Sequence, residues 1–243
     1  MKKFSDALLK RTQLFSKQVE ALSFSFEGYV YNPLNYAWPL HAAYLERYVH
    51  PNVKLLFLGM NPGPFGMAQN GIPFGDSVMV KEWLKIEGEV GKPPQEHPKR
   101  EIQGLECQRR EVSGTRLWSL MAEKFETPQN FFKDHAIMNY CPLVFVDGGA
   151  GGRNIIPEKL PREERLALEE VCDAYLDDII RMINPQTLVG IGQYAKKKLE
   201  LSKRRLNLEQ AVISVLHPSP SSPLANRGWK EQAIKELEEA GVW

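Results

Sequence analysis

The chain has 243 residues, of which 43% are hydrophobic and 25% charged, and its formal net charge is +1. These values are typical of a globular protein and exclude a disordered or membrane-embedded chain. No apolar run is long enough to span a bilayer, and the first residues lack a secretory signal. We therefore expect one domain over residues 1–243, located in the cytoplasm, or in the nucleus if the source is eukaryotic.

The cysteine pattern bears on metals and cofactors, and the net charge bears on partners. Three cysteines, Cys107, Cys141 and Cys172, are odd in number, lie far apart and form no CxxC pair. This pattern disfavours a disulfide framework, a zinc site and an iron–sulfur cluster, so we expect reduced, mostly buried thiols, no metal and no cofactor. A net charge near zero neither predicts nor excludes a polyanionic partner.

The order of apolar patterns along the chain predicts the fold class. Residues 5–22 have the spacing of an amphipathic helix, and 162–183 and 193–201 are also helical in pattern. Four short, almost continuously apolar runs are each followed by Gly, Asn, Pro or His, as is typical of strands buried on both faces. Strands that alternate with helices indicate a parallel sheet. We predict an α/β fold with a central four-stranded, mostly parallel sheet and helices on both faces, the strands being residues 53–58, 136–138, 187–191 and 211–216.

Two segments are predicted to be loops. Residues 85–111 are polar and contain three prolines, which indicates a long surface loop or lid. Residues 147–154 (DGGAGGRN) are rich in glycine, but no Lys-Ser or Lys-Thr follows them as in a phosphate-binding P-loop. We interpret the second segment as a plain loop.

The residues that follow the predicted strands are the first place to look for a site, because ligands of open parallel sheets bind beyond the carboxyl ends of the strands. Residues 59–76 are rich in Gly and Pro, which makes a stiff loop that a ligand can approach closely, and they include Asn61 and Phe74. Asn139 follows the second strand and His217 the fourth. Two amides, an aromatic ring and an imidazole can hold a planar nucleobase and stabilise it as it leaves.

Three ordered motifs resemble the uracil-DNA glycosylase superfamily, and most closely its single-strand-selective monofunctional branch. The segment GMNPGPFGMAQNGIPFGD (59–76) resembles the water-positioning and base-stacking loop of that branch. NYCPL (139–143) resembles its uracil-reading segment, and HPSPSSPLANRGW (217–229) its catalytic-histidine loop and DNA wedge. The resemblance covers residues 55 to 229 and implies the fold of that superfamily.

The implied activity is that of a monofunctional DNA glycosylase in base excision repair. Such an enzyme flips uracil out of DNA and hydrolyses its N-glycosidic bond without a metal, which leaves an abasic site. Its partner would be single- or double-stranded DNA that contains uracil or a related damaged base. We expect a monomer that does not bind membranes.

The resemblance also implies roles for individual residues. Asn61 would position the attacking water, and His217 would stabilise the negative charge that develops on O2 of the leaving uracil. Asn139 would read N3–H and O4, Phe74 would stack on the ring, and the Met60 N–H would contact O2.

Two further positions bear on specificity and on catalysis. Gly63 stands where stricter uracil glycosylases have a tyrosine, so the resemblance implies room for 5-hydroxymethyluracil. Asp76 is the nearest alternative carboxylate, but its interpretation as the N-cap of a helix over residues 77–84 is at least as good. In the wedge, two serines replace a basic and an amide residue of vertebrate members, and Leu224 and Arg227 are the candidates to enter the base stack. The implied DNA-binding residues are Pro218, Ser219, Pro220, Ser221, Ser222, Leu224 and Arg227.

Most of these residues have an ordinary structural alternative. Asn61 and Asn139 are residue types common in turns, and Phe74 is of a type usually found in cores. Basic residues within 196–205 either follow DNA phosphates or form a solvated helix face. We interpret the remaining histidines as loop residues: His41, His50, His97 and His135.

Other function classes remain open at this point. GIGQYA (190–195) matches the GxGxxA form of a nucleotide- or dinucleotide-binding oxidoreductase. However, the next predicted strand ends at Leu216-His217, where such a protein would place a ribose-binding acid. A serine hydrolase is disfavoured because no GxSxG motif is present. A catalytically silent DNA-binding module of the same fold is the third alternative.

Overall fold

The central sheet consists of four parallel strands in the order β3-β2-β6-β7. The computed structural model describes residues 2–243, and in it all four strands lie where the sequence predicts them. They are β2 (Leu55–Gly59), β3 (His135–Asn139), β6 (Thr187–Ile191) and β7 (Ala211–Val215). The predicted α/β class and the four-stranded parallel sheet are therefore confirmed.

The strands differ in burial according to their position in the sheet. Every residue of β2 is buried, as expected for a central strand between two helical layers. The edge strand β7 is exposed at Ala211 and only half-buried at the three residues that follow, so the expectation of burial on both faces is wrong for this strand. The strand β7 has a neighbouring strand on one side only, whereas β3, at the other edge, is buried at four of its five residues.

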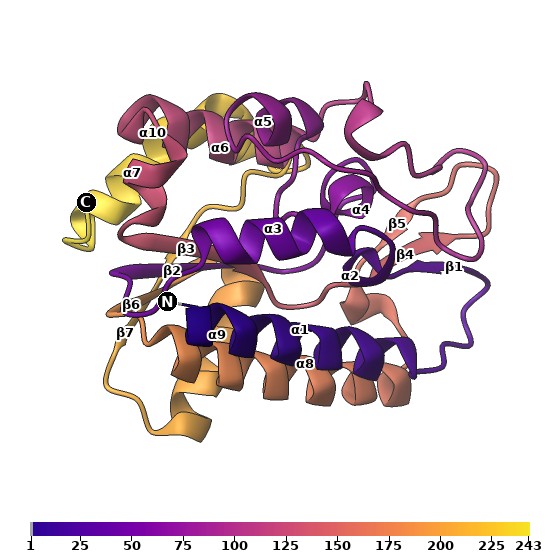
Figure 1. Cartoon of the computed structure of the whole chain (residues 1–243), viewed down its shortest axis with the longest axis horizontal. Coiled ribbons are helices and arrows are strands. Elements are labelled where there is room, and N and C mark those ends of the chain that lie inside the picture. Colours follow the sequence, from indigo (N-terminus) through magenta and orange to yellow (C-terminus); the bar gives the residue numbers. More distant parts are fainter. Residues whose placement is uncertain (1) are drawn as a thin grey trace.

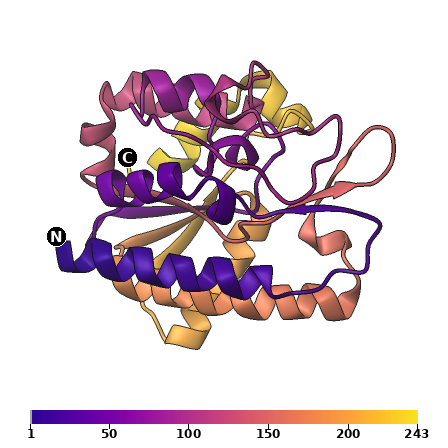
Figure 2. The same ribbon diagram turned by 45° about the vertical axis from the view of Figure 1, so that its right-hand side comes forward.

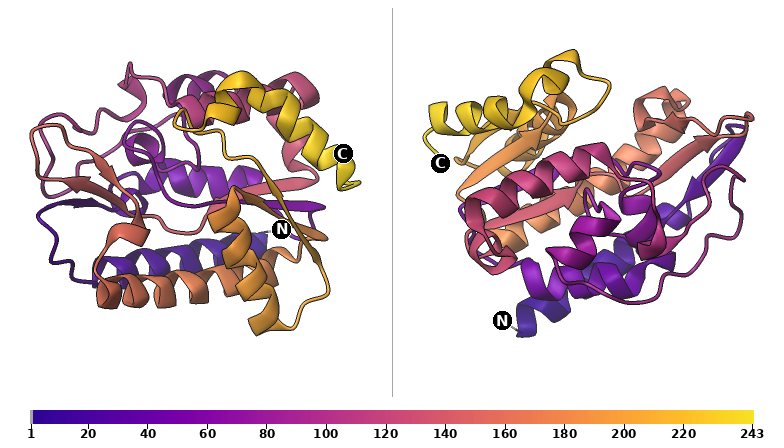
Figure 3. Two further views of the ribbon diagram at one scale, coloured as in Figure 1. Left: turned by 180° about the vertical axis from the view of Figure 1, so that it is seen from behind. Right: turned by 90° about the horizontal axis from the view of Figure 1, so that it is seen from above.

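Helices cover both faces of the sheet (Figure 1). Below it in that view lie α1 (Lys2–Glu20), α8 (Arg162–Ile183) and α9 (Gln193–Leu206). Above it lie α5 (Ser77–Glu82), α6 (Val112–Phe125), α7 (Pro128–Phe132) and α10 (Pro223–Glu239), and α3 (Trp38–Tyr48) runs along the sheet. Seen from behind, α10 and α9 lie on opposite sides of the sheet (Figure 3).

The N-terminal helix packs lengthwise against α8 (Figures 1 and 2). The rings of Phe15 and Tyr175 stack with centroids 3.9 Å apart, and Arg11 Nε donates to Asp178 Oδ2 at 2.7 Å. The predicted helix over 162–183 matches α8, whereas α9 continues five residues beyond the prediction and ends at a left-handed Asn207. Asn is one of the few residues that readily adopt this C-terminal conformation.

A second, smaller sheet was not predicted. It is antiparallel, with the order β1-β4-β5, and consists of β1 (Gly28–Tyr31), β4 (Val144–Asp147) and β5 (Asn154–Ile155). The glycine-rich segment predicted as a plain loop connects β4 to β5 as a hairpin. Its ends are joined because Arg153 donates from its backbone and from Nε to the Asp147 carboxylate. A two-residue strand carries too little periodicity to be recognised in a sequence.

The predicted loop over residues 85–111 is irregular except for one 3₁₀ turn, η1 (Gly104–Glu106). Its apolar residues Ile86 and Ile102 are buried, and the His97 N–H donates to Tyr31 Oη at 2.8 Å. Buried side chains and a hydrogen bond thus hold this segment against the rest of the protein. Three short turns of helix complete the described chain, namely α2 (Pro33–Tyr36), α4 (Met67–Asn70) and η2 (Pro157–Lys159).

Two of the four remaining histidines do not lie in loops, so their interpretation was wrong. His41 is buried in α3, where its Nδ1 lies 2.6 Å from the Gly71 carbonyl oxygen. His135 is buried at the start of β3 between the rings of Phe57, Phe125 and Phe131. Burial lowers the pKa of each imidazole to about 4. In both positions the neutral ring serves as a core aromatic.

Two further properties concern membranes and thiols. No helix between residues 2 and 243 has the length and apolarity needed to cross a membrane. The three cysteines are buried, as expected, and none of them forms a disulfide with another described residue.

Candidate active site

A pocket of about 400 Å³ opens beyond the carboxyl ends of the parallel strands. Its walls come from the loop after β2, the end of β3, the loop after β7 and the start of α6. The six residues expected to perform catalysis or bind the base all line it: Met60, Asn61, Gly63, Phe74, Asn139 and His217. Segments more than 150 residues apart in sequence meet here because parallel strands bring their carboxyl ends to one edge of the sheet.

Gly59, the last residue of β2, lies against two side chains that line the pocket. A Cβ atom at this position would overlap Asn139 Oδ1 and would lie 2.7 Å from Phe74 Cε2. The Asn139 amide and the Phe74 ring thus converge on one glycine. Any larger residue there would force both side chains apart.

Asn139 presents an unsatisfied acceptor. It pairs with Gly59 in the β2–β3 register, and its Nδ2 contacts Met67 Sδ at 3.2 Å. Its Oδ1 is buried and has no hydrogen-bond partner among residues 2–243. A buried polar atom without a partner costs about 1–3 kcal/mol, and such atoms are rare in folded proteins. The amide is therefore well suited to a ligand that offers an N–H donor.

Phe74 adopts a backbone conformation that is unusual for its residue type. Its φ is +54°, a left-handed value that costs a residue with a side chain roughly 1–2 kcal/mol. Trp118 Nε1 donates to the Phe74 carbonyl oxygen at 3.0 Å, and Gly114 packs so closely that a Cβ there would overlap this oxygen. Contacts from α6 thus hold the ring in place against the pocket.

His217 faces Phe74 across the pocket, with ring centroids 6.2 Å apart and planes tilted by 43°. Burial lowers the pKa of His217, so the imidazole is neutral at physiological pH. Leu216, the residue before it, forms hydrogen bonds through its backbone N–H and its carbonyl oxygen. The N–H donates to Glu236 Oε2 at 2.6 Å, and the carbonyl accepts from Trp229 Nε1 at 2.6 Å. Helix α10 thereby positions the histidine.

Asn61 and Met60 form the entrance to the loop after β2. Asn61 Nδ2 donates to the Pro62 carbonyl at 3.2 Å, and the half-buried amide can still contact a water in the pocket. The Met60 carbonyl accepts from the Cys141 N–H at 2.8 Å, which joins this loop to the segment after β3.

Asp76 lies outside the residues that line the pocket. As the N-cap interpretation predicts, its side chain accepts from the Met79 N–H at the start of α5, which ends at Glu82 rather than at residue 84. Arg110 Nε donates to the same carboxylate at 2.8 Å. Burial raises the pKa of Asp76, but the hydrogen bonds from Arg110, Met79 and Glu111 outweigh it and hold the pKa below its ordinary value. Asp76 thus connects the N-terminus of α5 to the N-terminus of α6 through these hydrogen bonds.

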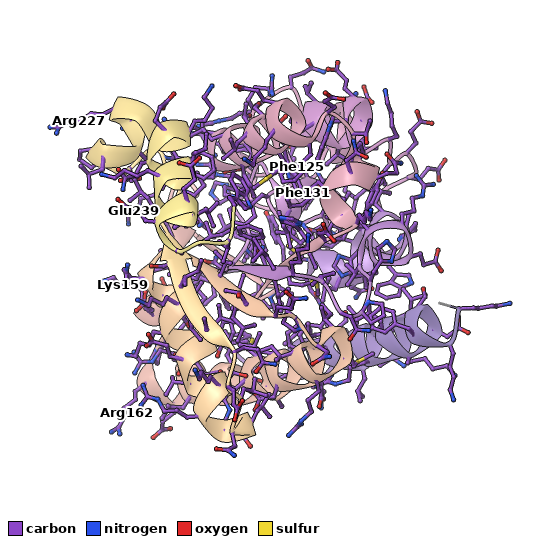
Figure 4. All side chains as sticks on the ribbon, turned by 90° about the vertical axis from the view of Figure 1, so that its left-hand side faces the viewer. Phe125, Phe131, Lys159, Arg162, Arg227 and Glu239 are labelled. Carbon is purple, nitrogen blue, oxygen red and sulfur yellow. The ribbon has the colours of Figure 1, made fainter. Side chains whose placement is uncertain are left out.

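Some residues of the expected DNA wedge, within 218–227, are buried and others are exposed. Pro218 is buried and its carbonyl accepts from Arg116 Nη1 at 3.0 Å, while Ser222 caps α10 by accepting from the Ala225 N–H. Leu224 is 61% exposed, and Arg227 points away from the ribbon (Figure 4). Three residues of this segment form one wall of the pocket, namely Ser219, Pro220 and Ser221.

Three of the six basic residues of α9 form ion pairs, namely Lys196, Lys198 and Arg205. Lys198 is buried against Glu169 at 3.1 Å, and Arg205 pairs with Asp173 and Asp177 at 3.0 and 2.8 Å. These contacts stabilise the packing of α9 on α8. For Lys198 and Arg205 they disfavour the interpretation as part of a track for DNA phosphates.

The GxGxxA pattern has a structural explanation. A Cβ at Gly190 would overlap the Lys196 backbone, and Gly192 has a φ of +90° where the chain turns from β6 into α9. The glycines allow close packing of helix on strand. This accounts for the motif that favoured an oxidoreductase.

Residues that the sequence interpretation missed also line the pocket. Glu111 and Ser113 come from the start of α6, Asn154 and Ile156 from the β5 hairpin, and Met67 from α4. Glutamate is not a preferred N-cap, and β5 was not predicted, so only the general polarity of these segments gave any signal. Within residues 2–243, no three His, Cys, Asp or Glu side chains are grouped as metal ligands would be.

Comparisons with known proteins agree with this geometry. The sequence profile of the uracil DNA glycosylase superfamily matches residues 46–238. The single-strand selective monofunctional uracil-DNA glycosylase of Rattus norvegicus is 45% identical over 215 residues, which cover 88% of this chain and 77% of the relative. The protein of the same name from Bos taurus is 42% identical over 239 residues, with 98% and 87% covered.

A solved structure supports the fold independently. The crystal structure of wild-type Pedobacter heparinus SMUG2 superposes with a TM-score of 0.64 at 19% identity, covering 94% of this chain and 99% of that one. At this identity the likeness shows the shared fold alone. The sequence matches establish that the chain belongs to the uracil-DNA glycosylase superfamily, in its single-strand-selective monofunctional branch, whose members are hydrolases of N-glycosyl bonds.

Proposed function

We propose that this protein removes uracil from DNA by flipping the nucleotide into the pocket and hydrolysing its N-glycosidic bond. The observation that carries the proposal is the convergence of the Asn139 amide, the Phe74 ring and the neutral His217 at the carboxyl ends of the strands. A nucleobase needs a flat surface, an edge that matches its donors and acceptors, and a group that stabilises its charge on departure.

The base-reading edge is provided by Asn139. Its buried, unsatisfied Oδ1 accepts from uracil N3–H, and its Nδ2 exchanges the weak contact with Met67 Sδ for a hydrogen bond to O4. The Phe74 ring stacks on the base. This pairing gains two good hydrogen bonds with uracil and opposes cytosine at both positions.

The chemistry proceeds through departure of the base. The C1′–N1 bond breaks, the electron pair leaves with uracil, and the negative charge collects at O2. There the neutral His217 donates a hydrogen bond, a form of stabilisation that is often worth about 10²–10³ in rate. Water placed by Asn61 adds to C1′ and loses its proton to solvent. Because Asn61 is a neutral amide, it orients the water and does not act as a strong base.

The pocket also favours a monofunctional reaction. Cleavage of the DNA strand through a Schiff base requires an amine nucleophile. None of the described residues that line the pocket is a lysine. With no amine to form a Schiff base, the reaction ends at the abasic site after water has added to C1′.

We further propose that the pocket accepts 5-hydroxymethyluracil and that the enzyme acts as a monomer on single- or double-stranded DNA. Gly63 lines the pocket without a side chain that would exclude a 5-substituent. The exposed Leu224 and Arg227 lie beside the wall formed by residues 219–221, where an apolar wedge and a cation can contact unstacked DNA.

The test is incubation with an oligonucleotide that contains one uracil, followed by alkaline cleavage of the abasic site. We expect cleavage at the uracil position with wild-type protein and none before alkali. Folded protein that binds this oligonucleotide without releasing the base would contradict the proposal and favour the silent DNA-binding module. A second control, titration with a nicotinamide dinucleotide, addresses the oxidoreductase alternative.

A further inference from the structure

Glu111 is a carboxylate in the pocket to which the proposed reaction assigns no role. It is the only acidic residue among the described residues that line the pocket. Its Oε2 accepts from the Gly114 N–H, so the side chain also caps α6. Capping alone does not explain a glutamate here, because Ser, Thr, Asp and Asn are the preferred capping residues. Burial also raises the pKa of Glu111, so keeping this carboxylate in the pocket costs energy.

The orientation of Asn139 locates the 5-position of the base. The Nδ2 end of its amide points at Met67. If Nδ2 donates to O4, then O4 lies toward Met67, and C5, which is bonded to C4, faces the neighbouring segment from Gly63 to Met67. This side of the pocket therefore borders any substituent on C5.

Glu111 occupies that same side. A Cβ on Gly66 would lie 2.6 Å from Glu111 Cγ, and a Cβ on Gly63 would lie 3.6 Å from Glu111 Oε1. The two glycines leave the space in which the glutamate side chain packs. Its Oε1 is directed to the space beside Gly63, where the 5-substituent is expected.

We propose that Glu111 is a specificity-determining residue that accepts a hydrogen bond from a hydroxyl group carried on C5 of the flipped base. The inference rests on the proposed glycosylase function of this pocket. A hydroxymethyl group would add a charge-assisted hydrogen bond to this carboxylate, beside those it accepts from Gly114 and Ser113. The methyl group of thymine would cover the carboxylate without offering a donor, and this disfavours excision of a normal base.

The variant Glu111→Ser separates recognition from capping. Serine is a good N-cap, so α6 keeps its first hydrogen bond while the carboxylate leaves the pocket. We expect the ratio of single-turnover rates, 5-hydroxymethyluracil over uracil, to fall about tenfold in matched oligonucleotides. Glu106→Ser is the matched control, because Glu106 is an exposed carboxylate on the nearby turn η1, and it should leave the ratio as in wild type.

A second variant displaces the carboxylate without changing it. In Gly66→Ala the new methyl group would meet Glu111 Cγ and push the side chain out of position. We expect the same preferential loss on 5-hydroxymethyluracil. This variant decides the question if Glu111→Ser fails to fold, as judged by circular dichroism.

The outcomes separate the two proposals. Equal losses on both substrates, or an unchanged ratio in folded variants, would overturn the assignment of Glu111 and leave it as a helix cap. Wild-type protein that excises neither base would instead contradict the proposed function itself.

Discussion

The Phe74 ring and the His217 imidazole face each other with centroids 6.2 Å apart and planes tilted by 43°. This spacing exceeds direct stacking, so the two rings bound the pocket from different directions. Phe74 is held by α6 and His217 by α10, and a base between the two loops is thus contacted from two different helices.

His217→Leu should slow single-turnover release of uracil about 10²-fold or more. The leucine fills a similar volume but cannot donate to O2, so the charge on the departing base loses its stabilisation. The rate is measured with enzyme in excess over a uracil oligonucleotide. His50→Leu, outside the pocket, serves as the control, and a wild-type rate in folded His217→Leu protein would remove this residue from the mechanism.

The free energy of unfolding should decrease in mild acid because two histidines are buried in their neutral form. His41 and His135 have folded-state pKa values of about 4, below the ordinary value near 6.5. Unfolding then takes up protons between these two values, so stability is highest above pH 6.5 and falls as the pH drops toward 4. Each histidine contributes up to about 1.4 kcal/mol per pH unit in this window.

His135→Phe should reduce the loss of folding stability between pH 6.5 and pH 4. Neither ring nitrogen of His135 has a hydrogen-bond partner within residues 2–243, and its neighbours are aromatic. Phenylalanine fits the same environment and does not titrate. Urea unfolding midpoints at two pH values, one near 7 and one near 5, provide the measurement. A variant as acid-sensitive as wild type would show that His135 is not responsible.

Gly63→Tyr should exclude 5-hydroxymethyluracil more strongly than uracil. The added side chain would start 3.6 Å from Glu111 Oε1 and would extend into the space assigned to the 5-substituent. Single-turnover rates on the two substrates, compared with wild type, measure the effect. If both rates fell by the same factor, Gly63 would not border this position.

Base release should persist in excess chelator. The proposed chemistry uses only side chains and water, and no metal-ligand cluster exists in the described part of the chain. The measurement compares rates with and without ethylenediaminetetraacetate. Activity that disappears with chelator and returns with added metal would count against the mechanism.

Asn139→Asp should lower uracil excision sharply and narrow the preference over cytosine. A carboxylate cannot donate to uracil O4, but it can accept from cytosine N4–H₂. Each mismatched buried polar group costs about 1–3 kcal/mol, so the two mismatches in wild type give roughly 10²–10⁴ in discrimination.

The test of Asn139 is the ratio of single-turnover rates on matched uracil and cytosine oligonucleotides. Asn35→Asp is the control, because Asn35 is an exposed amide on α2 outside this pocket. An unchanged ratio in folded Asn139→Asp protein would show that Asn139 does not recognise the edge of the base.

The sequence predicted those parts of the fold that have strong periodicity. The strands of the parallel sheet are short, continuous apolar runs and the helix α8 has a long helical pattern. The rule that ligands bind at carboxyl strand ends then placed Asn61, Asn139 and His217 together. The second sheet was missed because β5 has two residues and the apolar run of β4 directly follows the NYCPL segment.

Other features depend on tertiary contacts and leave no local pattern. The left-handed conformation of Phe74 is supported from α6, where Trp118 Nε1 donates to its carbonyl oxygen and Gly114 leaves room for that oxygen. Glu111 lies at the pocket on a segment that Asp76 joins to α5, by accepting from Arg110 Nε and from the Glu111 N–H. Neither could be inferred from neighbouring residues alone.

The unsatisfied oxygen of Asn139 has a consequence after the reaction is complete. The free base keeps its N3–H, so released uracil can satisfy Oδ1 as well as the nucleotide does. A ligand that binds only the folded state stabilises it by mass action. Free uracil should therefore raise the melting temperature and compete with substrate, so that escape of the base can limit turnover on abundant substrate.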